Sequence, residues 1–209
     1  MRARTQEAKD ERRTELLSVA LDVFYERGFD LARMDDIARR AGVSKGAVYL
    51  YFDSKEALFN ALIQEIAAPI PMAIRENVRA AGDPEEALRA FLRSWPMIIR
   101  ETPVPKIIKV LIGASATFPE LVTAYREDVI ERAVAVIASV LEAGRAADVF
   151  DIDDPMLTAE LVIGPFIGAV MRHVVLAVDH EAEVDFEELF TLHEKLVLRA
   201  LKPAAGRTR

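Results

Sequence analysis

The apolar residues of this chain recur at helical spacing from near its start to near its end. Between Lys9 and Arg27, an apolar stripe at i, i+3, i+4 and i+7 spacing is formed by Leu16, Leu17, Ala20, Leu21, Val23 and Phe24. A stripe of this width indicates a helix with one face in the core. No stretch alternates between apolar and polar residues as a half-buried strand would. The pattern therefore predicts an all-α fold.

A short motif over residues 34–55 combines two helices and a tight turn. Asp35–Ala41 has the apolar spacing of one helix, and Gly42 supplies the left-handed backbone that ends a helix without strain. Ser44 is a good N-cap for a second helix over Lys45–Phe52. Two short helices joined in this way are typical of a helix-turn-helix, whose second helix can enter the major groove of DNA.

Helical patterns continue after this motif. One helix begins after the N-cap Ser54 and is interrupted at Pro69 and Pro71, because each proline lacks an amide donor and clashes with the preceding turn. Further helical patterns cover residues 84–95, 106–116, 118–147, 156–178 and 185–201. The sequence thus predicts about nine helices in all. They divide into a three-helix N-terminal head over residues 1–62 and a larger helical domain over residues 63–209.

Composition narrows the chemistry that the chain can carry. There is no cysteine, which excludes disulfides and thiolate ligands, and the three histidines form no metal-binding motif. The sequence has no phosphate-binding glycine loop and no nucleophile–base pair near a motif, so we expect neither an enzyme nor a cofactor. The N-terminus has no apolar signal region, and no apolar run reaches the roughly 18–20 residues of a membrane span. These features predict a soluble, cytoplasmic protein without a membrane partner.

The net charge of −7 is unfavourable for nucleic-acid binding when it is averaged over the whole chain. Its distribution changes the picture, because basic and acidic residues nearly balance in residues 1–55 and the acidic surplus lies after them. The net positive charge of the head is still small. We therefore expect DNA affinity to depend on well-placed individual contacts and on a second head.

The motif and its distance from the N-terminus resemble the tetracycline-repressor (TetR) family of bacterial transcription regulators. The likeness covers roughly residues 9–62 and rests on Gly28-Phe29, Asp36-Ile37-Ala38, Ala41-Gly42-Val43-Ser44-Lys45-Gly46, Tyr49, Tyr51-Phe52 and Ser54-Lys55-Glu56-Ala57-Leu58. The later runs Phe118-Pro119-Glu120-Leu121 and Asp153-Asp154-Pro155 are similar to one C-terminal type within that family. The remainder of the C-terminal half is similar only in being helical.

The resemblance implies a homodimer whose two heads read a partly palindromic operator in double-stranded DNA. It also implies a C-terminal half that dimerises through its last two long helices and encloses a pocket for a small-molecule effector. A repressor that the effector releases from DNA is the expected function. A transcriptional activator of the same fold, or a DNA-binding protein that needs no effector, is the alternative.

The expected DNA contacts follow from the placement of polar groups on the head. They are Arg33, Ser44, Lys45, Gly46, Ala47, Tyr49, Tyr51 and Lys55. Lys45 begins the recognition helix, where it can reach a guanine edge or a phosphate. Tyr49 can place its hydroxyl on a phosphate, and Lys55 lies at a helix N-terminus that favours an anion. The alternative is that Lys45 and Tyr49 are ordinary surface residues, and that Tyr51 packs inside.

One position departs from the family pattern. Many members have a threonine at the start of the first motif helix, where this chain has Arg33 preceded by Ala32. Arginine is a poor N-cap, so this helix start should be less well fixed. We hypothesise that the charge of Arg33 contacts a phosphate instead.

The expected effector pocket has to come from aromatic and polar groups of the C-terminal half. The candidates are Trp95, Met97, Phe118, Tyr125, Phe166, Met171 and His173. Each of them is also compatible with an ordinary core position. The abundance of apolar side chains favours an apolar or amphipathic effector. Arg126, Arg132 and Arg172 would suit an anionic ligand, but solvated salt bridges are the simpler interpretation.

The expected dimer interface lies on the last two helices. Its candidates are Gly164, Gly168, Arg172, Leu189 and Leu196. Gly164 and Gly168 are four residues apart, so they share one face and would let another backbone approach closely. The helix that carries them is apolar on most faces, which also suits a central core helix.

Overall fold

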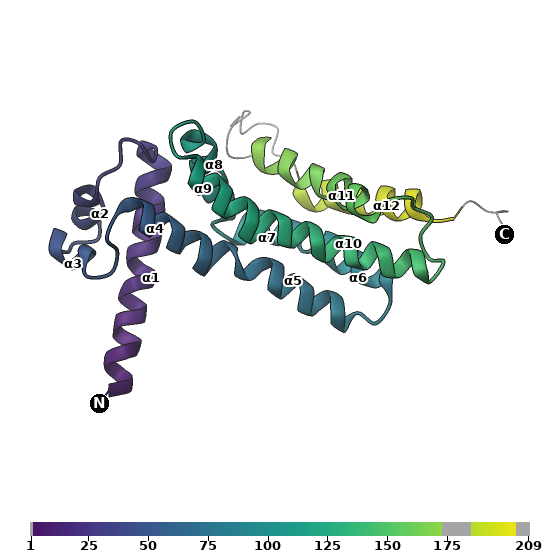
Figure 1. Cartoon of the computed structure of the whole chain (residues 1–209), viewed down its shortest axis with the longest axis horizontal. Helices are drawn as coiled ribbons and strands as arrows, with labels where there is room; N and C mark the ends of the chain where they lie inside the picture. The colour runs from purple at the N-terminus through teal and green to yellow at the C-terminus, as the bar shows by residue number, and fades with distance from the viewer. Residues whose placement is uncertain (1, 173–184, 204–209) are drawn as a thin grey trace. The chain divides into compact units, whose positions relative to one another are not determined.

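The computed structural model of this protein describes residues 2–172 and 185–203 (Figure 1). Within those ranges the chain forms helices and connecting turns without a strand, which confirms the all-α prediction. The helices are α1 (Arg2–Arg27), α2 (Met34–Arg40), α3 (Lys45–Tyr49), α4 (Lys55–Leu62), η1 (Ile63–Ala67), α5 (Pro69–Ala80), α6 (Pro84–Arg93), α7 (Trp95–Glu101), α8 (Val104–Ala114), α9 (Pro119–Tyr125), η2 (Arg126–Ile130), α10 (Glu131–Ala146), α11 (Pro155–Val170) and α12 (Phe186–Leu201). Helix α1 begins earlier than its apolar stripe predicts, because the polar residues before the stripe carry no core-facing signal.

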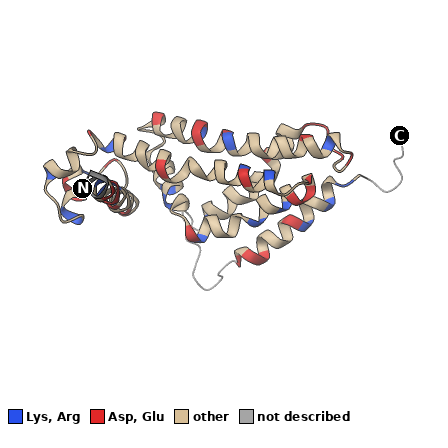
Figure 2. Cartoon of the chain, turned by 90° about the horizontal axis from the view of Figure 1, so that it is seen from below, with Lys and Arg blue, Asp and Glu red and all other residues tan. Residues whose placement is uncertain are grey.

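The chain forms two compact units that do not follow the order of the sequence. Unit 1 contains residues 1–68 and 106–128, and unit 2 contains residues 69–105 and 129–209. The segment 106–128 therefore belongs with the N-terminal helices. The predicted domain boundary between residues 62 and 63 stays a prediction. Acidic and basic residues are interspersed along the helices of both units (Figure 2).

Aromatic rings form the core of unit 1. The ring centroid of Phe29 lies 5.0 Å from that of Phe24, 5.5 Å from that of Phe59 and 4.9 Å from that of Phe118. Phe24 and Phe59 are also in edge contact at 5.8 Å. Such edge-to-face and tilted pairs at 4.5–7 Å are the favoured geometry of aromatic rings. They join α1, the loop after it, α4 and the start of α9.

Polar contacts attach the segment 106–128 to α1 within unit 1. The ammonium group of Lys106 lies 2.7 Å from a carboxylate oxygen of Asp22, and that of Lys109 lies 4.2 Å from the ring centroid of Tyr25. The hydroxyl of Thr117 donates to the Asp30 carboxylate at 3.3 Å. This segment thus contacts both α1 and the loop that follows it.

The expected interruption before Pro69 takes the form of a π-helical turn. In η1, the amide of Ala68 donates to the carbonyl of Ile63 at 2.8 Å, which is a bond across five residues. Widening the turn accommodates Pro69, which has no amide donor and whose ring would crowd the preceding carbonyls of an α-helix. The predicted long helix over residues 118–147 contains a similar turn, η2, between α9 and α10.

Aspartate side chains cap three helix starts in unit 2. Asp83 accepts hydrogen bonds from the amides of Glu85 and Glu86, and Gly82 before it has a φ of +79°. Asp154 caps α11 and Asp185 caps α12 in the same way. An N-cap carboxylate satisfies amides that have no partner inside the helix. The start predicted near residue 84 is therefore confirmed.

One described helical run is long enough to cross a membrane by its length and composition. It covers residues 55–80, and 44% of its most apolar window is buried in the fold. A buried core helix passes the same test, so the run is weak support for a membrane span.

A close backbone contact in unit 2 requires glycine at position 144. The amides of Val149 and Phe150 donate to the carbonyl of Gly144 at 2.8 and 3.1 Å. A Cβ atom at Gly144 would lie 2.0 Å from Cδ2 of the buried Phe150 ring. The chain after α10 can therefore turn back only against a residue without a side chain.

We predict that Gly144→Ala lowers the free energy of unfolding by about 1–3 kcal/mol, because the Phe150 ring has to leave its place. Gly113→Ala is the matched control: no atom lies within 4 Å of the added Cβ, and the position is inside α8. Alanine there should raise stability by about 0.4–1 kcal/mol. Urea unfolding at one protein concentration measures both, and equal stability of the two variants would contradict the close contact.

Candidate functional site

Helices α2 and α3 form a helix-turn-helix whose turn is held by local hydrogen bonds. Gly42 adopts a φ of +67°, a conformation that side chains disfavour, and the amide of Val43 donates to the carbonyl of Ala38 at 3.0 Å. The hydroxyl oxygen of Ser44 accepts from the amide of Ala47 at 3.2 Å. Ser44 thus caps α3, as the sequence predicts. Val48 is fully buried and fixes which face of α3 points inward.

The opposite face of α3 is open to solvent. Tyr49 is 41% exposed and Leu50 is 85% exposed, while Lys45 and Gly46 are exposed as well. The nearest atom to a Cβ added at Gly46 would be the Ser44 hydroxyl, at 4.0 Å. A surface with so little side-chain bulk at its N-terminal end allows a close approach of the α3 backbone to a flat or grooved partner.

Lys45 is held by a carboxylate on the preceding helix. Its ammonium group lies 2.8 Å from Oδ1 of Asp35, and 5.9 Å from the ring centroid of Tyr49. The hydrogen bond and the negative charge of Asp35 raise the pKa of Lys45 above its usual value. Both partners are exposed, so this ion pair is weak and an incoming anion can displace it.

The start of α2 is held by contacts of Asp36. The Asp36 carboxylate accepts from the backbone amide of Arg33 at 3.3 Å. Guanidinium groups of Arg27 and Arg39 lie 2.8 and 3.3 Å from the same carboxylate. A guanidinium has no acceptor, so the side chain of Arg33 makes no cap itself and remains exposed. Arg33 therefore supplies no side-chain cap, as expected, and the hydrogen bond and ion pairs of Asp36 help to hold this helix start.

Lys55 has partners inside unit 1 that the sequence did not predict. Its ammonium group donates to the carbonyl of Phe29 at 2.8 Å and to that of Asp30 at 3.1 Å. It also lies 4.7 Å from the Phe29 ring centroid and 5.2 Å from that of Phe118. These contacts give Lys55 a structural role at the loop between α1 and α2. Tyr51 is half-buried, and its contact with DNA stays a prediction.

Six of the seven expected effector contacts lie in the described residues, and these six are divided between the two units. Trp95 is buried in unit 2 and packs on the rings of Phe166 and His193 at centroid distances of 5.5 and 5.4 Å. Phe118 and Tyr125 belong to unit 1. Met97 is 50% exposed, Met171 is half-buried, and His173 lies outside the described residues. Among the described candidates, the rings of Trp95 and Phe166 are in mutual contact.

Burial alters the titration of several groups in the two cores. Burial raises the pKa of Tyr125 and lowers that of His193, whose ring nitrogen contacts the carbonyl of Val162 at 3.1 Å. Burial by itself raises the pKa of Glu194, but hydrogen bonds from Arg93 and Arg89 outweigh it and lower that pKa below its usual value. Burial for Tyr125, and burial together with these partners for His193 and Glu194, explain the pKa shifts in structural terms. No cluster of metal-ligating side chains exists in the described ranges.

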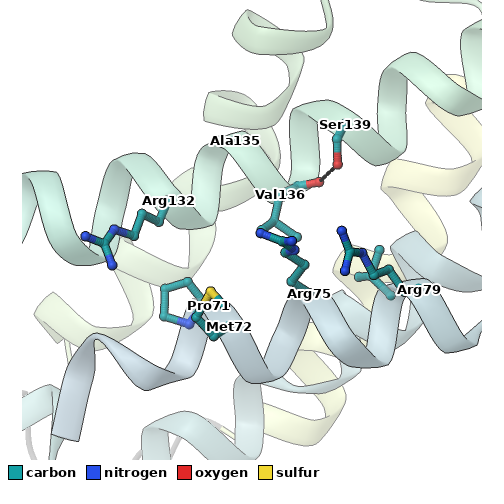
Figure 3. Close-up of a pocket in the computed structure, with 9 residues that line it drawn as sticks. Pro71, Met72, Arg75, Arg79, Arg132, Ala135, Val136 and Ser139 are labelled. Atoms are coloured by element: carbon teal, nitrogen blue, oxygen red, sulfur yellow. Dashed lines mark hydrogen bonds between the residues drawn. The ribbon is translucent and has the colours of Figure 1, made fainter. Parts of the chain in front are cut away.

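Unit 2 contains a groove between α5 and α10. Arg132, considered above for an anionic ligand, lines it together with residues that the sequence did not single out. Arg75 and Arg79 extend from α5 toward α10, and Arg132 lies on α10 (Figure 3). The hydroxyl of Ser139 donates to the carbonyl of Val136 at 2.7 Å on the facing helix. The four-residue spacing of Arg75 and Arg79, which places them on one helix face, is the sequence signal that was available.

The candidate interface residues on α11 and α12 lie at the surface of unit 2. A Cβ added at Gly164 or Gly168 would have no atom within 4 Å. Leu189 is 37% exposed, Leu196 is 55% exposed, and Arg172 is exposed too. Further large apolar side chains are exposed on the same helices, namely Met156, Leu157, Leu161, Ile167 and Leu192. This apolar surface has the composition of an interface.

Two family models match the chain. The model described as bacterial regulatory proteins, tetR family, matches residues 16–62, and that described as AefR-like transcriptional repressor, C-terminal domain, matches residues 86–189. Among curated proteins, the transcriptional repressor NicS of Pseudomonas putida is 30% identical over 213 residues, which cover 95% of this chain and 96% of that protein. The transcriptional activator FasR of Mycolicibacterium smegmatis is 40% identical over 87 residues, 42% of this chain. The chain spans 40% of the length of FasR.

A solved structure agrees with these matches over most of the chain. The flavonoid-responsive regulator FrrA has a TM-score of 0.64 and 31% sequence identity, covering 94% of this chain and 100% of that one. The similarity therefore extends through both the helix-turn-helix and the larger helical part.

The contacts of Lys55 lead to a prediction about stability. Lys55→Gln should lower the free energy of unfolding by about 1–2 kcal/mol, because it removes charge-assisted hydrogen bonds and ring contacts in a partly buried position. The matched control Lys45→Gln, in an exposed ion pair, should change it by less than about 0.5 kcal/mol. Urea unfolding followed by circular dichroism measures both variants. A Lys55→Gln protein as stable as Lys45→Gln would show that Lys55 has no structural role.

Proposed function

This chain belongs to the tetracycline-repressor (TetR) family of bacterial transcriptional regulators, and we propose that it is a dimeric repressor released from a palindromic DNA operator by a small-molecule effector. The observation that carries the proposal is the open outer face of α3, held by the Ser44 cap and the buried Val48. A short capped helix with Lys45 and Tyr49 on its free face has the size and the donors to read a major groove. A regulator of this kind would act in the cytoplasm.

The individual DNA contacts are part of this proposal. Lys45 and Tyr49 would contact base edges or phosphates, with Gly46 and Ala47 allowing the close approach. Arg33, whose side chain is exposed at the start of α2, would contact a phosphate. Lys55 is the weakest member of the expected set, because its ammonium group already donates to two carbonyls.

Dimerisation is supported by the exposed apolar surface of α11 and α12. Association of two copies through this surface would cover leucines such as Leu161, which is 77% exposed. Two-fold symmetry would also place two heads on one operator, and a palindrome mirrors that symmetry. The modest positive charge of a single head makes this second head important for affinity.

A second candidate function is activation by the same fold. FasR, which matches the chain over 87 residues, is named an activator, whereas NicS is named a repressor. A promoter–reporter assay separates the two, because deletion of the gene raises expression under a repressor and lowers it under an activator. An effector-independent regulator is the third form, and it would bind its operator with the same affinity under all metabolite conditions.

We predict that specific DNA binding depends on the open face of α3. The Lys45→Gln/Tyr49→Phe double variant should bind a fluorescein-labelled palindrome from the adjacent promoter at least tenfold more weakly than the wild type. The expected loss corresponds to about 1–3 kcal/mol per base contact. Fluorescence anisotropy at a fixed salt concentration measures it.

The matched control for that titration is Lys202→Gln. It removes the same charge from unit 2, where the ammonium group of Lys202 pairs with Glu85 at 3.3 Å. The control should bind DNA like the wild type. Equal binding by the double variant and the control would refute the assignment of α3 as the reading helix.

We also predict that Leu196→Glu shifts the protein from dimer to monomer. The side chain is 55% exposed in the single chain, so the folded protomer tolerates the charge while an apolar interface does not. Ile112→Glu on α8, where the side chain is 40% exposed, is the control and should stay dimeric. Sedimentation velocity over a range of concentrations measures the two states. A Leu196→Glu dimer as tight as the control would place the interface elsewhere.

A further inference from the structure

The groove between α5 and α10 has the size of a small-molecule site. Its cavity volume is about 620 Å³, within the range of roughly 300–1,000 Å³ that is typical of ligand pockets. The groove lies entirely within unit 2. Apart from its arginines, its lining is mainly apolar and includes Met72, Val78 and Val136. A ligand could therefore bury an apolar body here.

The charges on this groove are of one sign. Arg75, Arg79 and Arg132 line it, and no carboxylate does. The one acidic residue of α5, Glu76, lies 3.9 Å from the Arg79 guanidinium, with both side chains more than 60% exposed. An ion pair of this length and exposure contributes little, so it leaves most of the positive potential at the groove. Arg132 has contacts of its own, so Arg75 and Arg79 are the arginines available to a ligand.

Arg75 has an unsatisfied donor at this site. Its Nε atom is buried and has no hydrogen-bond partner in the described part of the protein. Buried N–H groups are almost always paired, because leaving one unpaired costs free energy. Figure 3 shows the Arg75 guanidinium reaching toward Val136 on α10, into the groove. An acceptor bound in the groove would pair with this donor.

We propose that this groove binds an anionic amphiphile, with its carboxylate or phosphate on Arg75 and Arg79 and its apolar body against Met72, Val78 and Val136. Guanidinium groups bind both oxyanions through paired, parallel N–H donors, and two of them four residues apart present such forks on one helix face. The proposal rests on the proposed function, because it makes this anion the effector of the regulator. It narrows the expected effector from apolar or amphipathic to negatively charged.

The first test is calorimetric titration of the full chain with three probes that share one apolar chain. Dodecanoate, dodecyl phosphate and uncharged 1-dodecanol are each added below the concentration at which they aggregate. We expect the anions to bind at least tenfold more tightly than dodecanol. Tighter binding of dodecanoate would indicate a carboxylic acid, and tighter binding of dodecyl phosphate a phosphoester. Equal affinity for dodecanol and the anions, or no binding of either anion, would overturn the proposal.

The second test places the anion on the two arginines. Arg75→Gln and Arg79→Gln should each weaken binding of the preferred anion about tenfold to hundredfold, the usual effect of losing a hydrogen bond to a charged group. Arg79 is 61% exposed, so its variant folds even if Arg75→Gln does not. The control is Arg145→Gln on α10, an exposed arginine 2.7 Å from Glu142 and outside the groove. Unchanged affinity in Arg79→Gln and in a folded Arg75→Gln would overturn the proposal.

A third measurement distinguishes failure of this inference from failure of the proposed function. The anisotropy titration against the palindrome is repeated with saturating anion. Weaker DNA binding supports both the groove and its effector role. Anion binding without any effect on DNA affinity would leave the groove standing and refute its role as effector site. DNA binding by a protein that binds no anion would refute the groove alone.

Discussion

The structure depends on the packing of Phe29 against rings from three other parts of unit 1. Phe29 lies in the loop after α1, and it contacts Phe24 of α1, Phe59 of α4 and Phe118 at the start of α9. Lys55 adds hydrogen bonds to the carbonyls of the same loop. This loop leads directly into α2, so the contacts that hold it also orient the helix-turn-helix. The head is complete only with a segment from much later in the chain.

This arrangement limits the covalent routes between the two units. The chain passes between them after residues 68, 105 and 128. Two of these passages lie at or beside π turns, namely η1 and η2, and the third lies in the first turn of α8. The side chain of Gln64 in η1 donates to Asp128 in η2, so the two π turns are joined within unit 1. Such turns are frequent at functional sites, and here they lie where the chain passes from one unit to the other.

The parts of this fold that the sequence predicts are those with a local cause. The N-caps Ser44 and Ser54 were predicted correctly, because each capping bond spans only three residues. The partners of Phe118 could not be predicted, since periodicity shows which face of a helix is buried but not which distant helix covers it. The candidate DNA face was predicted because it belongs to one contiguous motif. Arg75 was not predicted as a site residue, because the groove it lines is completed by α10, a helix more than fifty residues away in the sequence.

Among the described residues of unit 2, some arginines pair with carboxylates and Arg75 does not, and this difference bears on function. Arg89 and Arg93 both pair with the buried carboxylate of Glu194, and Arg89 also pairs with Glu85 at 2.7 Å. Desolvated charges persist in this core because each is compensated. Arg75 has no carboxylate partner among the described residues, although acidic residues outnumber basic ones in the chain, 34 to 27. A shortage of acidic residues in the chain therefore does not explain why Arg75 faces a groove that no described carboxylate lines. Retention of a cation in that setting is what a site for an anion requires.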